Sequence, residues 1–230
     1  MRRAKILCAT IYFNNVKKMR IIPTLFRGTV YLQASLKAFE LDSRIMEEKY
    51  GLRVRQIDYG NDADLETWMN IIHTSYDDCH FTVDTARKYL AAHRFMNHTK
   101  TFLFQEIEGG SIVATVSFGI YKVNPKVGGD FRIGVTKAAQ GKGYGRLCIL
   151  FAFSQLASMG IKYGESAISF KRKESLHLHY ALGFRPQTNL KYVANRTTEK
   201  KVKNFNFLLK YRLLKSYRDY LRKERGKFNK

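Results

Sequence analysis

Cysteine is scarce in this sequence. The chain contains three, Cys8, Cys79 and Cys148, and no two of them stand in a C-x-x-C spacing. An odd number of widely separated cysteines argues against a disulfide framework and against a zinc site. We therefore expect reduced thiols and no bound metal.

Long apolar runs are also missing, since no run approaches the roughly 20 residues of a membrane-spanning helix. The stretch Ile6–Phe13 is interrupted by Thr10, and no clear small-residue cleavage site follows it. The 230 residues, of which 45% are hydrophobic, are enough for one sizeable core with short extensions. We expect a cytoplasmic protein with one domain of catalytic size.

Acidic residues are absent from one end of the chain and few at the other. Residues 1–39 hold eight Lys or Arg and no acid, and residues 171–230 hold eighteen against four acids, whereas residues 40–170 hold fifteen of each. The net charge of +22 therefore comes from the two ends. This distribution predicts catalysis in the neutral middle and, at the ends, binding of an anionic partner, either a membrane surface or a nucleic acid.

Helical spacing of apolar residues extends over Val30–Tyr50 and ends at Gly51. We divide the chain into a basic N-terminal extension with a helix (residues 1–51), a catalytic domain (52–212) and a basic helical tail (213–230). The tail alternates apolar and aromatic residues with cations, a form typical of helices that lie on a membrane surface. The alternative is a helix that docks its apolar face on the domain.

Within residues 52–212 the hydrophobic period switches repeatedly between strand-like and helix-like. The expected strands are Leu52–Ile57, Thr101–Ile107, Ser111–Tyr121, Phe131–Val135, Glu165–Phe170, Leu190–Ala194 and Phe205–Tyr211. Four helices are expected. The first follows the cap residues 61–64, and the second covers Val83–Phe95 with Thr82 as its N-cap. The third covers Tyr144–Met159, and the fourth covers Glu174–Leu182 with Gly183 as its C-cap. This order predicts an α/β fold with a mixed sheet, of the α+β kind.

The segment Gln140-Gly141-Lys142-Gly143-Tyr144-Gly145 lies between a strand that ends near Val135 and the buried helix that follows. Backbone N–H groups and the helix dipole at such a turn favour a phosphate-bearing ligand. A Rossmann fingerprint needs a third glycine where this chain has Arg146, and the P-loop pattern is absent. Both common nucleotide motifs are therefore excluded.

The spacing of Gln140, Gly143 and Gly145 resembles the Q/R-x-x-G-x-G/A motif of the GNAT (Gcn5-related) N-acetyltransferases. A second stretch, from Ser175 to Phe184, is similar to the family's "LYxxxGF" helix. The resemblance covers roughly residues 52–211. It implies a GNAT-like acyl-CoA N-acyltransferase fold with acetyl-CoA, or another acyl-CoA, as cosubstrate.

The resemblance also implies where acyl-CoA binds. The pantetheine arm would pair with the backbone near Val135, Thr136 and Lys137, and the amides of the glycine segment would take the pyrophosphate. Lys142 and Arg146 would add charge, with a solvated surface role as the alternative. At the position of a frequent family Asn this chain has Arg172, which would meet coenzyme A phosphates or an anionic substrate, or stay solvated. The implied cofactor-binding set is Val135, Thr136, Lys137, Gln140, Gly141, Lys142, Gly143, Tyr144, Gly145, Arg146 and Arg172.

Acyl transfer to an amine needs a base for the amine proton and gains from an acid near the leaving thiolate. The family's frequent tyrosine acid falls on His179, and Tyr180 is its neighbour, about 100° around the helix. The alternative for His179 is a packing role. For the base, Glu165 and Asp130 are the candidates on two adjacent strands, although each also suits a structural role.

Two functions follow from these observations. The first is an enzyme that transfers an acetyl group to a primary amine of a small molecule, a sugar or a peptide. The second is a catalytically weak acyl-CoA-binding module whose basic ends bind nucleic acid or an anionic membrane surface, so that the protein would be peripheral at a membrane. Thiol release from acetyl-CoA in the presence of amines distinguishes the two.

Overall fold

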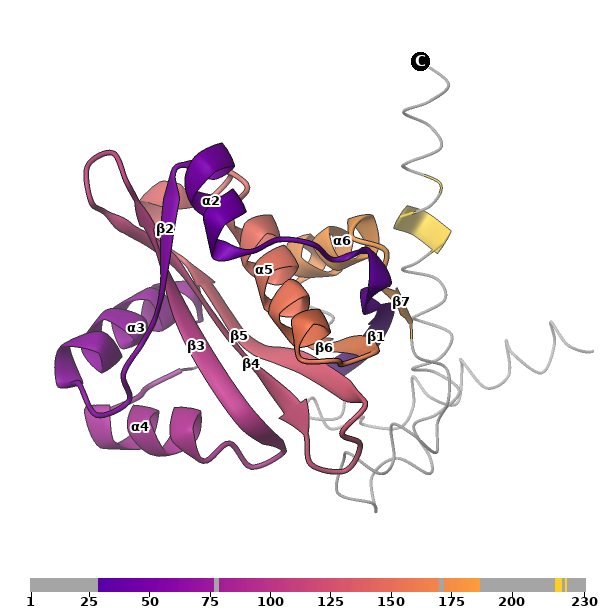
Figure 1. The fold of residues 1–230 in the computed structure, drawn as a ribbon, viewed down its shortest axis with the longest axis horizontal. Helices are drawn as coiled ribbons and strands as arrows, with labels where there is room; N and C mark the ends of the chain where they lie inside the picture. The colour runs from indigo at the N-terminus through magenta and orange to yellow at the C-terminus, as the bar shows by residue number, and fades with distance from the viewer. Residues whose placement is uncertain (1–28, 77–78, 170–171, 187–217, 221, 223–230) are drawn as a thin grey trace, which may run out of the picture.

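The computed structural model describes residues 29–76, 79–169, 172–186, 218–220 and 222 (Figure 1). Its strands are β1 Thr29–Ser35, β2 Leu52–Gln56, β3 Met96–Glu106, β4 Ile112–Tyr121, β5 Val127–Val135, β6 Tyr163–Ser169 and β7 Arg185–Pro186. Its helices are α2 Ser43–Tyr50, α3 Asp62–Ser75, α4 Val83–Ala91, α5 Tyr144–Ser158 and α6 Lys173–Ala181, with the short 3₁₀ helices η2 Leu36–Ala38 and η3 Lys137–Ala139.

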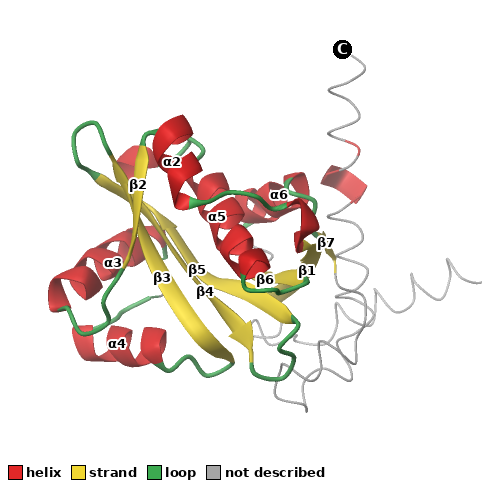
Figure 2. Ribbon diagram, viewed as in Figure 1, coloured by secondary structure: helices red, strands yellow, loops and turns green. Residues whose placement is uncertain are grey.

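The strands form one sheet in the order β2-β3-β4-β5-β6-β1-β7. Only the β5–β6 pair is parallel among these neighbours, and the others are antiparallel. Helices cover both faces, with α3 and α4 on one side and α2, α5 and α6 on the other (Figure 2). The predicted mixed α/β fold is confirmed.

Helix α5 fills the core on its face of the sheet because almost every side of it is apolar. The Phe151 ring lies 5.1 Å from Phe102 of β3, and Phe153 lies 4.9 Å from Phe184 after α6. Gly160, with φ +79°, follows α5, as predicted for the end of this helix. The helix is therefore held rigidly, and its N-terminus has a fixed place beside β5.

On the opposite face, α3 and α4 form a second core around Trp68, which is fully buried. Asn61 caps α3 by accepting the N–H of Ala63, and Thr82 caps α4 by accepting the N–H of Thr85. Both caps were predicted. Helix α4 ends at Ala91, four residues before the predicted Phe95.

The predicted helix over Val30–Tyr50 is wrong in its first half. Residues Thr29–Ser35 form β1, which pairs antiparallel with β6 and β7 near one edge of the sheet, and only Ser43–Tyr50 is an α-helix. Leu32 and Ala34 are buried with the strand period of two, while the spacing of Leu32, Leu36 and Phe39 also fits a helical face. Sheet pairing decided between the two periods.

Several predictions concern residues outside those described. The strands Leu190–Ala194 and Phe205–Tyr211 lie there, as do most of the basic extension and the tail. Of residues 213–230, the structure describes 218–220 and 222, which are helical. No helix in the described part of the chain is long and apolar enough to cross a membrane.

Candidate active site

A cleft opens where two parallel strands separate. β5 and β6 pair from Val127 beside Tyr163 to Asp130 beside Ser166, and no pair follows. At that point Ser117 of β4 faces Arg132 while Phe118 faces Asp130, so Phe131 is the extra residue of a β-bulge. The bulge bends β5 away from β6. The predicted alternation of Phe131, Ile133 and Val135 with Arg132 and Gly134 is therefore wrong at Phe131, where the bulge shifts the register.

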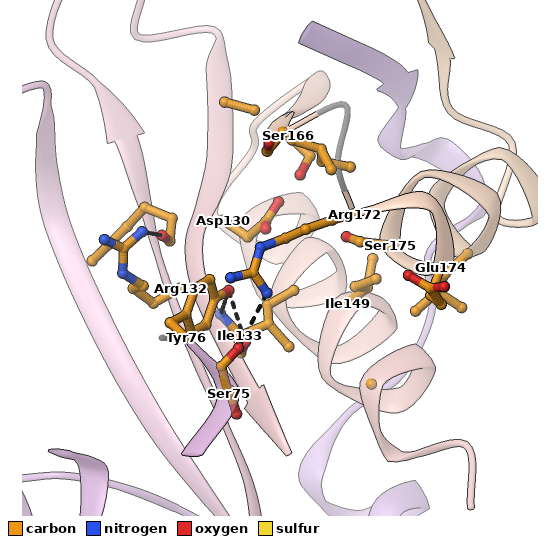
Figure 3. Close-up of a pocket in the computed structure, with 16 residues that line it drawn as sticks. Ser75, Tyr76, Asp130, Arg132, Ile133, Ile149, Ser166, Arg172, Glu174 and Ser175 are labelled. Atoms are coloured by element: carbon orange, nitrogen blue, oxygen red, sulfur yellow. Dashed lines mark hydrogen bonds between the residues drawn. The ribbon is translucent and has the colours of Figure 1, made fainter. Parts of the chain in front are cut away.

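The space between the separating strands is a cavity of about 880 Å³. It runs from Asp130 and Ser166, at the end of the paired segment, to Gly145 and Ile149 at the start of α5. Figure 3 shows its polar side chains converging from β5, from β6 and from the ends of α3 and α6.

The glycine segment adjoins the end of the cavity next to α5, which Gly145 lines. Gly141 has φ +82°, and Gly143, the N-cap of α5, has φ +91°, a conformation that other residues rarely adopt. A Cβ added at either position would meet nothing within 4 Å, so the space in front of the loop is open. Lys142 N–H donates to Ala139, whereas the N–H groups of Gly141, Gly143, Tyr144 and Gly145 donate to no backbone carbonyl in the described residues. These donors are free to bind an anion.

Asp130 lines the other end of the cavity, and His179, which is 1% exposed and not part of the lining, lies behind it. Asp130 Oδ1 lies 4.0 Å from His179 Nε2, and both atoms are buried without a hydrogen-bond partner in the structure. His179 Nδ1 is 2.8 Å from the carbonyl oxygen of Ser175. A carbonyl only accepts, so Nδ1 carries the proton and Nε2 of the neutral ring presents a lone pair toward Asp130.

Burial shifts both groups toward their neutral forms. It lowers the pKa of His179, which the neighbouring Asp130 and the Ser175 carbonyl oppose. It raises the pKa of Asp130, against the opposing effects of His179 and of a hydrogen bond with Ser166. A proton between these two groups therefore has two acceptors, the carboxylate of Asp130 with its raised pKa and the imidazole of His179 with its lowered pKa.

The family assignment rests on a direct match: the acetyltransferase (GNAT) family matches residues 65–184, more than half of the 230 residues. The chain belongs to the GNAT acetyltransferase family. No curated protein matches the chain.

Solved GNAT structures share the fold. A GCN5-related N-acetyltransferase from Sphaerobacter thermophilus aligns with a TM-score of 0.52 and 16% identity, over 69% of this chain and 48% of that one. A glucosamine N-acetyltransferase region of a fungal multi-domain GH3 beta-N-acetylglucosaminidase aligns with a TM-score of 0.51 and 14% identity, over 78% of this chain and 22% of that one. A tandem GNAT protein from the clavulanic acid biosynthesis pathway aligns with a TM-score of 0.50 and 13% identity, over 70% of this chain and 50% of that one. The chain thus spans half or less of the length of these structures.

The glycine end of this GNAT cleft suits the phosphates of an acyl-CoA, because four backbone N–H groups there lack a backbone acceptor in the described residues and the space beside Gly141 and Gly143 is open. Lys142 and Arg146 are exposed beside them, and Gln140 Nε2 donates to the Val135 carbonyl at 3.4 Å. Tyr144 points its hydroxyl to Glu106 Oε1 at 2.6 Å and so ties the start of α5 to β3. Of the glycine segment, Gly145 lines the cavity, and the acyl-CoA contacts that the motif implies stay a prediction.

The predicted pantetheine contacts look different. Thr136 N–H donates to Val113 of β4, and Lys137 begins the 3₁₀ helix η3, so neither faces the cleft. Val135 N–H instead donates to Ser75 Oγ at 3.2 Å. Tyr76 Oη donates to the Ile133 carbonyl at 2.9 Å. Hydroxyl groups from the end of α3 thus occupy the free edge of β5.

The other two catalytic candidates lie outside the cavity lining. Tyr180 is 2% exposed and packs in the core with its ring 5.4 Å from Tyr220. Glu165 is fully buried and stands beside Gly129 in the paired part of β6. Of the four catalytic candidates, Asp130 alone lines the cavity; His179 is buried behind it, within 4.0 Å, whereas Tyr180 and Glu165 lie elsewhere in the core.

Ser75, Tyr76 and Arg132 are among the residues of the cavity wall that sequence reasoning missed. Arg132 is the one charged residue of the predicted strand Phe131–Val135, which is a signal that was available in the sequence. Ser75 and Tyr76 end a helix some sixty positions before β5, and no local pattern places them there.

Proposed function

We propose that this protein transfers an acyl group, in the first place acetyl, from acyl-CoA to the nitrogen of a primary amine. The observation that carries the proposal is the Asp130–His179 pair, whose facing atoms are buried, unpartnered and 4.0 Å apart at the end of a GNAT cleft. Such orphaned polar atoms are costly in a folded protein, which favours a role in proton transfer.

In the proposed reaction Asp130, which lines the cavity, accepts the proton of the incoming ammonium group. His179 lies behind it, and its neutral Nε2 shares that proton. The free amine then attacks the thioester carbonyl, the C–N bond forms and the C–S bond breaks. The proton held by the pair passes to the departing sulfur, and the nitrogen then gives its second proton to the vacated pair. The products are an amide and a free thiol, and the pair releases the remaining proton to solvent.

The thioester of acyl-CoA supplies the activated carbonyl, and the amides of the glycine segment hold the phosphates. Ser166 supports Asp130 through a hydrogen bond. The Ser175 carbonyl keeps the imidazole in one tautomer, as a positioning contact.

The test is thiol release from acetyl-CoA with a chemically diverse panel of amines, measured for the parent protein and for Asp130→Asn. We expect turnover with at least one amine, and its loss in the variant while acetyl-CoA still binds in calorimetry. Binding of acetyl-CoA with no turnover on any amine would reject the enzyme and favour the acyl-CoA-binding module. The basic ends that such a module would use fall mostly outside the described residues, and their anionic partner stays a prediction.

A further inference from the structure

Two arginines stack on one tyrosine at the wall of the cavity. The guanidinium carbon of Arg172 lies 4.1 Å from the centroid of the Tyr76 ring, and that of Arg132 lies 5.2 Å from it. Arg132 also lies 5.4 Å from the Tyr89 ring of α4. Stacking on aromatic rings holds a guanidinium in place and leaves its N–H donors, which lie in the guanidinium plane, for other partners.

The Tyr76 ring is itself fixed. Its hydroxyl donates to the Ile133 carbonyl at 2.9 Å, and burial raises its pKa, so the hydroxyl keeps its proton. Arg172 extends across the cavity toward this ring, as Figure 3 shows, and Nη1 donates to the Ser75 carbonyl at 3.1 Å. The two positive charges are therefore held near one rigid ring.

Neither arginine has an acidic partner within the described part of the chain. Arg132 Nη1 donates to the Phe131 carbonyl at 3.2 Å, while its Nε is buried and has no partner. The carboxylates that line the cavity are Asp130, which faces His179, and Glu174, which is exposed at the start of α6. A buried guanidinium donor without a partner is unfavourable, so the site suits a ligand that brings an anionic oxygen.

The position of Arg132 separates this cluster from the coenzyme A phosphates. The bulge at Phe131 turns Asp130 toward His179 and α6, and turns Arg132 toward Tyr76 and Tyr89, on the α3–α4 face of the sheet. The glycine segment lies on the other side of β5, at the N-terminus of α5. Asp130 and Arg132 are two residues apart, and at the cleft they are turned toward opposite faces of the sheet.

We infer that the acceptor amine carries an anionic oxygen group, a carboxylate or a phosphate, which binds to Arg132 and Arg172 while the amine lies at Asp130. The inference rests on the proposed function and adds the chemical class of the acceptor. Arginine suits both groups, because its planar fork of donors matches the oxygens of a carboxylate or a phosphate.

The experiment compares two matched pairs of acceptors, glycine with glycinamide and O-phosphoethanolamine with ethanolamine, by thiol release from acetyl-CoA. We expect kcat/KM to be roughly tenfold to a hundredfold higher for the anionic member of at least one pair, the range for a charge-assisted hydrogen bond. The pair with the larger ratio identifies carboxylate or phosphate as the preferred group. Equal rates within both pairs would overturn the inference.

The variants are Arg132→Gln and Arg172→Gln, with Arg53→Gln on the exposed face of β2 as the matched control. Arg132→Gln should remove the preference for the anionic amine by raising its KM, and should leave the Kd of acetyl-CoA unchanged. A parallel weakening of acetyl-CoA would assign the guanidinium to the cofactor and overturn the inference. Arg172 also donates a hydrogen bond to the Ser75 carbonyl, so Arg172→Lys is added as a second variant at this position. We expect it to fold and to lose the preference for the anionic amine.

An equilibrium measurement separates this inference from the proposed function. Calorimetric binding of O-phosphoethanolamine and glycine to the full chain requires no turnover. Binding that Arg132→Gln abolishes, with no thiol release from any amine, would support the anion site and reject acyl transfer. Thiol release with neutral amines, and no binding of either anion, would support acyl transfer and overturn the anion site.

Discussion

His179 Nε2 and Asp130 Oδ1 face each other at 4.0 Å, buried and without other partners. The gap is too long for a direct hydrogen bond and leaves the proton of an incoming amine two sites to occupy. The family motif indicates His179 as a catalytic candidate. The sequence alone, in contrast, did not favour Asp130 over Glu165 as the base.

Replacement of His179 by alanine should lower kcat more than KM. A residue that acts in proton transfer contributes roughly a hundredfold or more to the rate, and its loss appears in the transition state rather than in substrate binding. Steady-state thiol release measures both constants. Tyr180→Phe is the control, because Tyr180 packs away from the cavity lining, and its activity should stay near that of the parent. If His179→Ala were as active as the parent, the proton-transfer role would belong to Tyr180 or to no side chain.

Replacement of Gly143 by valine should abolish acyl-CoA binding while the protein still folds. The side chain would point into the open space before the glycine segment, and at φ +91° it would cost roughly 1–3 kcal/mol in backbone strain. Calorimetry measures the affinity for acetyl-CoA, and thermal unfolding measures the strain.

Gly160→Val is the matched control for that experiment. Gly160 has φ +79°, and an added Cβ would meet nothing within 4 Å, but it lies at the far end of α5. It should lose similar stability and keep its affinity for acetyl-CoA. Unchanged affinity in Gly143→Val would remove the phosphate-binding role of the segment.

The parts of the site that the sequence predicts are those encoded by contiguous residues. The glycine segment, the helix that follows it and the helix with His179 are each recognisable from their own spacing, and two motifs in order define the family. The cap residues Asn61 and Thr82 are equally local. These features need no knowledge of what packs against them.

The remaining parts depend on contacts between distant segments. β1 has a spacing that fits two periods, and its pairing with β6, more than a hundred positions later, selects the strand. The bulge at Phe131 depends on its register with β4, and the contact of Ser75 with Val135 joins residues sixty positions apart. A single sequence carries no direct signal for such pairings.

Acid should destabilise the fold through His93. Its ring is buried and stacks on Phe131 at 4.2 Å, and burial, helped by Arg132 and Lys122, lowers its pKa from 6.5 to about 4. The folded state therefore binds fewer protons than the unfolded state between these values, so the free energy of unfolding is fully retained above pH 6.5 and falls as the pH drops toward 4. The slope from this group approaches about 1.4 kcal/mol per pH unit.

Urea unfolding at several pH values measures this effect in the parent and in His93→Phe, which keeps an aromatic ring against Phe131. The variant should lose part of the slope between pH 6.5 and 4, whereas His80→Gln, at an exposed histidine, should keep it. The same slope in His93→Phe and in the parent would show that another group carries the acid sensitivity.

The last prediction concerns the free edge of β5, where Ser75 Oγ accepts the Val135 N–H at 3.2 Å and donates to the Ile71 carbonyl at 2.8 Å. If the pantetheine arm pairs with Val135, it must first replace this hydroxyl. Ser75→Ala removes the competitor, and a typical hydrogen bond contributes about 0.5–1.5 kcal/mol, so acetyl-CoA should bind roughly twofold to tenfold more tightly. Thr74→Ala is the matched control, because its hydroxyl bonds to the same Ile71 carbonyl at 2.9 Å and makes no contact with β5. Calorimetry on both variants decides: weaker binding in Ser75→Ala alone would mean that the Ser75 hydroxyl itself contacts the bound acyl-CoA, and equal affinity in all three proteins would mean that the arm does not use the Val135 N–H.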